Sequence, residues 1–548
     1  MSTEDSPRGL PAANPNYLPT RKLLWFGLCV TCLSQFNVAV PYTIINAPEP
    51  ILLSFINRSY TQQFLQFNST RLLTRPPLNS LELDSLWGAF ASMFPVGLFF
   101  GAVLFAPLAD RWGRRFVLFV VANVFCVLGS VAMFAAQYLF VFELMYVGRF
   151  LQGVSAGVSA SILPVYITEC SPIEIRGLLN SLRGTFAYVL SAFGIVISLP
   201  QLLGTDRLWG TCLAFQGFVS VIQIACTLLF PESPVFDYNN GRRNRAIATL
   251  NAYFPSTAQA GNLETPQDAL VRFEHESREP VKALSVRRVF SEPWLRRAAM
   301  LALALGISKP ISGLALVEMY SCRMMIQAGL TQSQSQYASL ALQLVGASVS
   351  IGVMFLVERA GRRTLMLYTI AGSLLLWAIV AIIRFATQDI VSEWSQYTLL
   401  ALYIAFGVVH PVGSTMVAWF LAAELAPLEA RAAISAVSVY TAPPFAVFTL
   451  LGYPTLDSIL GPTSVVVVFV APLMLLLVVF WLYLPETKQR PIDEIMRDLG
   501  KPDLVREESR ATQPHVQGVD ADDVERNGGQ ALLAGWEDDR QPIINMCN

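Results

Sequence analysis

Twelve long runs of mainly apolar residues alternate with shorter polar segments along this chain. Each run has about 20 residues or more, which at 1.5 Å per residue is enough for a helix to cross about 30 Å of hydrocarbon. The pattern therefore predicts an all-α membrane protein with twelve transmembrane helices. The predicted spans are 23–47, 85–109, 116–137, 139–166, 180–203, 209–230, 297–320, 336–356, 364–383, 396–422, 432–454 and 463–484.

The composition agrees with a chain that is embedded in a membrane. Hydrophobic residues make up 54% of the 548 positions and charged residues 14%, whereas a soluble domain carries about 25% charged residues. The net charge of −1 gives no pull toward nucleic acid, and the long apolar runs make the lipid bilayer an expected partner. Cys29 and Cys32 form a C-x-x-C inside a span and are interpreted as packing residues. No cofactor and no metal are predicted.

Short charged motifs recur at matching places in two halves of the chain. Asp110-Arg111-Trp112-Gly113-Arg114-Arg115 follows the second span, and Glu358-Arg359-Ala360-Gly361-Arg362-Arg363 follows the eighth. A Glu-x-x-Pro-x-Glu-x-Arg motif ends the fourth span at 169–176 and the tenth at 424–431. The repeat predicts two six-helix bundles of the kind that rock about a site near the membrane midplane. The alternative is that these charges only fix the topology.

The polar segments set the domain organisation and the orientation. We expect a tail at 1–22, a bundle at 23–230, a middle segment at 231–296, a second bundle at 297–484 and a tail at 485–548. Basic residues gather on one side of the spans, so the positive-inside rule puts both tails and the middle segment in the cytoplasm. The sequons at Asn57 and Asn68 fall in a predicted loop on the other side. These features predict a multi-pass glycoprotein of the plasma membrane with both termini in the cytoplasm.

The acid-Arg-x-Gly-Arg-Arg turns resemble the signature loop of the major facilitator superfamily. Further motifs at 164–169, 176–177, 231–234, 357–363 and 485–488 are similar to those of the sugar porter family. Gln35-Phe36, Ile45-Asn46-Ala47-Pro48 and Gly148-Arg149-Phe150 narrow the resemblance to the animal facilitative glucose transporters. The resemblance covers about residues 22–497.

The resemblance implies a carrier of the major facilitator fold with a helical cytoplasmic domain in its middle segment. Such carriers move hexoses, polyols or urate by alternating access, and they close their cytoplasmic side with ion pairs that must break when the halves separate. By matching motif, this cytoplasmic gate would consist of Asp110, Arg114, Arg115, Arg149, Glu169, Arg176, Glu232, Glu358, Arg359, Arg362, Arg363, Glu424, Arg431 and Glu486.

The chain departs from the family where sugar is bound. The pattern Gln-Gln-x-Ser-Gly-x-Asn of the seventh span is replaced by residues 309–315, which begin with Lys309 and Pro310. The expected Asn of the eighth span becomes Gly346, and a His-Gln pair of the fifth becomes Arg183-Gly184. Two Asn of the eleventh become Val439 and Pro443. A hexose needs many donors and acceptors to replace its hydration, so these losses disfavour hexose binding by the usual contacts.

Ionisable residues stand among the replacements. Lys309 lies about 18 Å from the cytoplasmic end of its span, and an ionisable group there suggests a functional site. The alternatives are that Lys309 pairs with Glu318 or extends to the interface, that His410 is a packing residue, and that Arg183 reaches back to the cytoplasmic surface. The candidate substrate-binding residues are Lys309, Ser312, Gly313, His410, Trp419 and Arg183.

Three functions are open at this point. The first is a facilitative uniporter for a hexose-like or other small polar solute. With Lys309 in the binding site, the favoured solute would be anionic or planar, such as urate. The second is a proton-coupled symporter of the same fold, although span 23–47 lacks the carboxylate that proton-coupled relatives carry there. The third is a non-transporting sensor that kept the fold. An enzyme is not expected, because no nucleophile constellation or phosphate loop occurs.

Overall fold

The computed structural model describes residues 21–67, 78–172, 175–255, 264–278, 284, 286–387, 393–488, 490 and 492–500. Every regular element in these ranges is helical, and twelve helical stretches are long and apolar enough to cross a membrane. The predicted all-α fold with twelve spans is therefore confirmed. The observed spans are Arg21–Thr43, Ser80–Trp112, Arg114–Leu139, Glu143–Cys170, Arg176–Ser198, Trp209–Leu229, Pro293–Gln327, Gln332–Met354, Arg362–Ala386, Glu393–Thr415, Glu429–Leu460 and Thr463–Tyr483.

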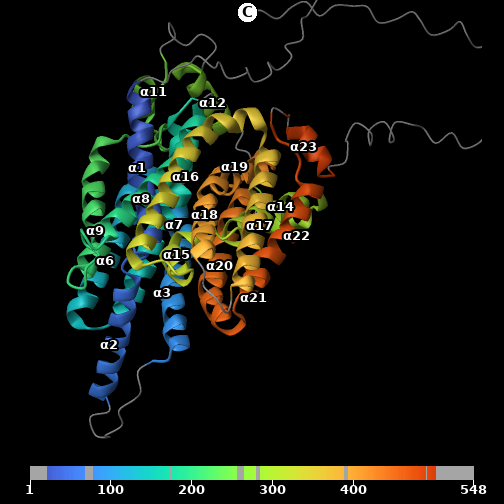
Figure 1. The fold of residues 1–548 in the computed structure, drawn as a ribbon. Helices are drawn as coiled ribbons and strands as arrows, with labels where there is room; N and C mark the ends of the chain where they lie inside the picture. The colour runs from blue at the N-terminus through green and yellow to red at the C-terminus, as the bar shows by residue number, and fades with distance from the viewer. Residues whose placement is uncertain are drawn as a thin grey trace, which may run out of the picture. The chain divides into compact units, whose positions relative to one another are not determined.

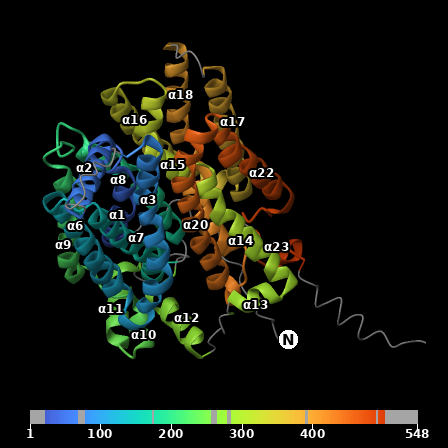
Figure 2. The same ribbon diagram turned by 90° about the horizontal axis from the view of Figure 1, so that it is seen from below.

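The first half of the chain builds one bundle (Figures 1 and 2). Its long helices are α1 (Arg21–Thr43), α3 (Ser80–Phe100), α6 (Ala122–Leu139), α7 (Glu143–Cys170), α8 (Arg176–Ser198) and α9 (Trp209–Cys226). The closest packing joins α3 to α7, and it depends on glycine. A Cβ atom at Gly97 would lie 2.1 Å from the Phe150 carbonyl oxygen, and one at Gly153 would lie 2.2 Å from that of Phe94. Backbones can approach this closely only where the side chains are small.

The second half builds the other bundle, and its seventh and tenth spans are interrupted beside the cavity. Its main helices are α14 (Pro293–Ile311), α15 (Leu314–Gln327), α16 (Gln332–Ala360), α17 (Arg362–Ala386), α18 (Glu393–Val409), α19 (Val417–Glu424), α20 (Leu428–Leu460) and α22 (Ala471–Tyr483). The seventh span breaks between α14 and α15, and a π-helical segment, η6 (Pro411–Thr415), separates α18 from α19. Interrupted helices free backbone groups at membrane depth, where they can line a cavity.

Short helices outside the spans confirm a helical middle segment. They are α10 (Pro234–Asn239), α11 (Arg243–Tyr253), α12 (Pro266–Arg278) and α13 (Val286–Ser291). Leu250, Phe254, Ala269 and Phe273 form a small core of their own between α11 and α12. A last helix, α23 (Ile492–Asp498), follows the twelfth span, and Arg490 pairs with Glu494 and Asp498 beside it.

The predicted loop after the first span is instead largely helix α2 (Glu49–Phe67). Leu52, Phe55 and Ile56 are buried, and their spacing places them on one face of that helix. The Phe55 ring lies 4.7 Å from the ring of Trp209, so this face packs on the first bundle. Asn57 lies on α2 with a half-buried side chain, whereas Asn68 falls outside the described residues.

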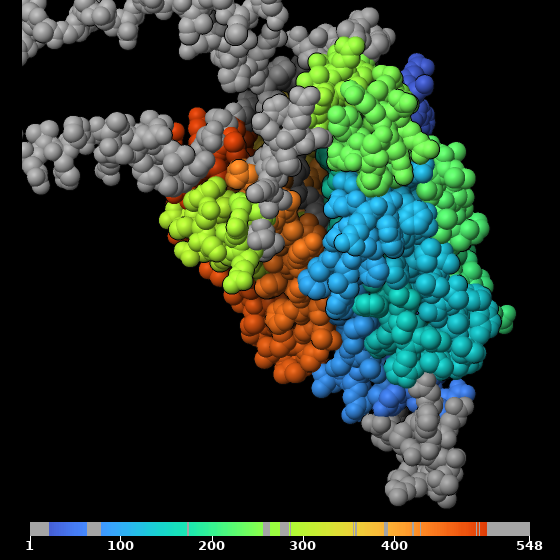
Figure 3. All heavy atoms as spheres, turned by 180° about the vertical axis from the view of Figure 1, so that it is seen from behind, coloured from blue at the N-terminus to red at the C-terminus, as the bar shows by residue number. Residues whose placement is uncertain are grey.

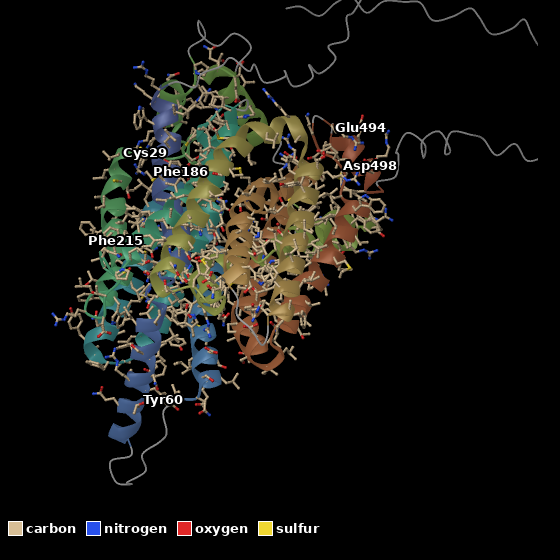
Figure 4. All side chains as sticks on the ribbon, in the orientation of Figure 1. Cys29, Tyr60, Phe186, Phe215, Glu494 and Asp498 are labelled. Carbon is tan, nitrogen blue, oxygen red and sulfur yellow. The ribbon has the colours of Figure 1, made fainter. Side chains whose placement is uncertain are left out.

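The helical assembly has two ends that differ in their charged residues. We call the end with the Gly113 and Gly361 turns the basic face, and the opposite end, where α2 carries Asn57, the sequon face. The middle helices α11 and α12 stand at the basic face (Figure 1). Figure 4 places Tyr60 of α2 at the sequon face and Glu494 and Asp498 toward the basic face. The halves meet along α3 with α20 and along α8 with α16, and Figure 3 shows the orange surface of α20 against the blue surface of α3.

Candidate functional site: a charged cavity between the two halves

A cavity of about 140 Å³ lies where the two bundles meet. Both halves contribute to it: α1, α3, α7 and α8 from the first, and α14, α15, η6 and α20 from the second. Most of its side chains are apolar, as the sequence departures predict. It is lined by Gln35, Val38, Ala39, Tyr42, Leu98, Ala160, Arg183, Gly184, Ala187, Lys309, Pro310, Leu314, Ala315, Glu318, Ser414, Thr415, Val439, Ala442, Pro443 and Ala446.

Three charged side chains share this cavity, of which two are cationic and one is acidic. Lys309 reaches it from the end of α14 and Arg183 from α8, so two cations line one apolar space. Arg183 is 9% exposed and repels the Lys309 ammonium, which argues against an arginine that turns back to the membrane surface. The single carboxylate is Glu318 on α15. Lys309 and Glu318 stand on opposite sides of the helix break, because α14 ends at Ile311 and α15 begins at Leu314.

The break between α14 and α15 is held by Ser312, Gly313, Trp377 and His410. The Ser312 carbonyl accepts a hydrogen bond from Trp377 Nε1 at 2.9 Å and lies 3.2 Å from His410 Nε2. Gly313 has φ +87°, and a Cβ atom there would lie 2.5 Å from the Trp377 ring. Three predicted binding residues, Ser312, Gly313 and His410, thus stabilise the break and are not among the lining residues, which favours the packing interpretation of His410. The side chain of Trp419 lies outside the described residues.

Two of the sequence departures allow the halves to approach each other. A Cβ atom at Gly346 of α16 would lie 2.4 Å from the ring of Tyr188 on α8, so no larger residue fits there in this state. A Cβ atom at Gly184 would lie 2.7 Å from Met416. The Tyr188 hydroxyl forms a hydrogen bond of 3.1 Å with that of Thr415, which joins α8 to η6 across the cavity.

At the basic face, the repeated motifs of the first half come together. Arg114 Nε lies 3.0 Å from Glu169 Oε2, and Arg114 Nη2 lies 3.1 Å from Asp110. The Glu232 carboxylate accepts a hydrogen bond of 2.9 Å from the Arg115 amide, and Ser233 donates to Glu169. These contacts tie the ends of the second, third, fourth and sixth spans by charge-assisted hydrogen bonds.

The second half repeats this arrangement with looser geometry. Arg362 Nε lies 3.6 Å from Glu424, and Thr487 donates to Glu424 as Ser233 does to Glu169. The Glu486 carboxylate accepts hydrogen bonds of 2.8 Å and 3.2 Å from the amides of Arg362 and Arg363. The correspondence between halves that the sequence repeat predicts is therefore present in three dimensions, and the contacts named here each join residues of one half.

Other predicted gate residues lie apart from these clusters. The prediction that Arg149 belongs to the cytoplasmic gate is wrong. Arg149 lies near the start of α7, toward the sequon face, where it is fully buried and its guanidinium is 4.9 Å from the Phe94 ring centre. The fourth span runs toward the basic face, so its early residues are at the other end. Arg176 Nε donates to the Ser171 carbonyl at 3.1 Å. Arg359 and Arg431 are exposed, and the side chain of Glu358 lies outside the described residues.

The sequence reasoning missed the charged cluster at the sequon face. Arg323 of α15 lies 3.3 Å from Glu49 of α2 and also forms an ion pair with Asp84 of α3. These bonds join the second half to the first. Asn46 adds hydrogen bonds of 2.8 Å to the Glu318 carbonyl and the Ser321 hydroxyl. The one sequence feature that could have indicated this cluster is Arg323 itself, which lies just beyond the predicted end of the seventh span.

A central cavity between two bundles of six spans defines a membrane carrier, and the comparisons with known proteins agree. The solved proton:xylose symporter XylE, bound to 6-bromo-6-deoxy-D-glucose, matches with a TM-score of 0.67 at 17% identity, over 87% of this chain and 98% of that one. An inward-open XylE from E. coli also matches at 0.67, with 16% identity over 87% of this chain and 99% of that one. At these identities the structures support the major facilitator fold.

The family model for sugar (and other) transporters matches residues 30–499, so the chain belongs to that family. Facilitated glucose transporter member 1 of Gallus gallus is 27% identical over 87% of this chain and 94% of the relative. Member 7 of Mus musculus is 27% identical over 94% of this chain and 97% of the relative. The chain is therefore a divergent, multi-pass membrane transporter of the sugar porter family and not an enzyme.

Proposed function

We propose that this transporter carries a small anionic solute across the membrane by alternating access. The observation that supports this most directly is that Lys309 and Arg183 line the same apolar cavity. Two cationic side chains that face one mainly apolar cavity attract an anion strongly, because water screens their charge little there. A planar organic acid such as urate fits this chemistry better than a hexose, because few hydroxyl and amide groups remain in the cavity wall.

The orientation belongs to the same proposal. Both tails and the middle helices lie in the cytoplasm, the sequon face lies outside the cell, and the protein resides in the plasma membrane. The support is the positive-inside rule together with the position of Asn57 on α2, opposite the basic turns. Glycosidase treatment of protein from a eukaryotic host should lower its mass through Asn57 or Asn68, and reporters placed in 50–80 should be extracellular. A cytoplasmic reporter would invert the assignment.

Coupling of solute transport to protons would require a titratable group such as a carboxylate in or beside the cavity. The first span holds no carboxylate, which favours a uniporter, whereas the structure places one carboxylate, Glu318, in the cavity wall.

The test is uptake by purified protein in proteoliposomes over a panel of organic anions, with urate included, and neutral hexoses and polyols. Lys309→Gln should lower anion uptake by about tenfold or more, the loss expected from about 1.4 kcal/mol of charge-assisted bonding, and should change uptake of neutral solutes less. Lys22→Gln, which alters an exposed lysine at the start of α1, is the matched control and should change neither. Robust glucose uptake that Lys309→Gln leaves unchanged would contradict the proposal.

A further inference from the structure

Glu318 is the one acidic side chain among the described residues that line the cavity. Within the described part of the chain, its carboxylate forms no hydrogen bond or ion pair, and only its backbone carbonyl is engaged, by Asn46. An acidic side chain that faces a mainly apolar cavity inside a membrane protein is costly to keep charged without a partner. This geometry suits a group that binds and releases a proton.

The groups that face Glu318 determine what its charge does to the site. Arg183 and Lys309 share the cavity with it, and the hydroxyls of Tyr42 and Tyr188 are near enough to feel its charge. With Glu318 ionised, its charge offsets one of the two cations. With Glu318 protonated, both cations act on the solute without that opposition. An anion is therefore attracted more strongly to the protonated cavity.

We propose, on the basis of the function proposed above, that Glu318 takes up one proton together with the solute anion, so that the carrier moves both in the same direction. The carboxylate receives the proton from water on the side to which the cavity is open and returns it as a hydrated proton on the other side. No bond other than the O–H bond forms or breaks. Because binding linkage is reciprocal, the anion also strengthens proton binding.

The position of Glu318 on α15 connects this event to the movement of the halves. The same helix carries Ser321 and Arg323, whose bonds to Asn46, Glu49 and Asp84 hold the sequon face together. Proton and anion therefore bind beside the helix that must leave its partners when the cavity opens toward the sequon face. Differential contacts of this kind are what a two-state carrier requires for coupling.

The first experiment uses full-length protein in proteoliposomes loaded with a pH-sensitive dye. Wild-type uptake of urate and the other anions of the panel should rise by up to about tenfold per pH unit on external acidification, and uptake should acidify the lumen. Glu318→Gln resembles the protonated group, so its anion uptake should stay near the acid-pH rate of the wild type at every pH, and lumenal acidification should stop. Glu393→Gln, at an exposed position outside the cavity, is the control and should keep coupled proton movement.

Anion uptake that is independent of pH in the wild type, or equally pH-dependent in Glu318→Gln, would overturn the inference and leave the proposed function standing. Loss of uptake in Glu318→Gln without any proton movement in the wild type would mean instead that Glu318 binds a cationic group of the solute. Absence of anion uptake at every pH would reject the proposed function.

A second measurement does not depend on the solute. Infrared difference spectra of the protein in lipid should show a protonated carboxylic acid that appears on acidification, is lost in Glu318→Gln and is retained in Glu393→Gln. Identical spectra for wild type and Glu318→Gln would overturn the inference even if the solute remained unidentified.

Discussion

The two faces of this transporter are both rich in ion pairs, but the pairs at one face lie within a half and those at the other join the two halves. At the basic face, Arg114 with Glu169 and Arg362 with Glu424 each join residues of one half. At the sequon face, Arg323 joins α15 of the second half to α2 and α3 of the first. A pair within one half can persist while the halves rock, whereas a pair between halves must break in every cycle. The structure is thus closed by cross-half bonds at the sequon face.

The largest effect is expected when the cross-half cluster is broken. Arg323→Gln leaves Glu49 buried without its partner, and removing one member of a buried pair typically costs about 3 kcal/mol or more. The balance should shift toward opening at the sequon face. Reactivity of cysteines introduced at that face measures the shift.

Arg384→Gln is the matched control for this experiment. Arg384 pairs with Asp457 at 2.8 Å at the same face, with similar exposure, but both residues belong to the second half. This variant should lower stability without changing cysteine reactivity. Equal shifts for both variants would refute the distinction between the two kinds of pair.

A smaller effect is expected within each half at the basic face. Glu169→Gln should destabilise the first half by about 2 kcal/mol, the usual contribution of a hydrogen bond to a charged group. Glu424→Gln should cost less, because its pair is longer, 3.6 Å against 3.0 Å, and Glu424 is 32% exposed against 15% for Glu169. Thermal unfolding in detergent measures both, and the reverse order would contradict the comparison.

The sequon face should also respond modestly to pH through Glu49. Burial raises the pKa of Glu49 to about 7, although Arg323 acts in the opposite direction. A carboxyl group whose pKa is raised in the closed state holds its proton more tightly there, so closure should weaken as the pH rises from 4.5 to about 7 and stay constant above that. Cysteine reactivity measured in a Glu318→Gln background isolates this effect, and Glu49→Gln should remove it.

The smallest effect is expected for a residue that the repeat marks as a gate. Arg431 is exposed, so Arg431→Gln should change the free energy of unfolding by no more than about 0.5 kcal/mol. The free energy of opening that cysteine reactivity reports should change by no more than this. Its counterpart in the first half, Arg176, is half-buried and bonded to Ser171, so Arg176→Gln should cost more. Comparable effects for the two variants would show that Arg431 has a role that this state does not reveal.

Much of this architecture follows from local features of the sequence. The length of the apolar runs predicts the spans, and the repeated motifs predict that Asp110, Arg114 and Glu169 meet, because each lies at a span end on one face. Lys309 could be placed in the cavity by counting residues along its helix.

Other features depend on packing between elements distant in the sequence. Arg149 follows the family motif, yet the direction of α7 puts it toward the opposite face. Ser312, Gly313 and His410 are polar or small residues near the cavity, and only the position of Trp377 shows that they stabilise the helix break. The partners of Arg323 lie in the other half, so no local pattern could identify them.

The central claim, that the sequon face closes by contacts that must break in each cycle, is tested most directly by a cross-link between the halves. Asn46→Cys and Ser321→Cys, in a Cys322→Ser background, replace side chains that lie 2.8 Å apart across the halves. Thr43→Cys with Ser191→Cys, at a close contact within the first half, is the control. Oxidation should abolish uptake in the cross-half variant, reduction should restore it, and the control should transport under both conditions. Undiminished uptake by the fully cross-linked cross-half variant would contradict the account.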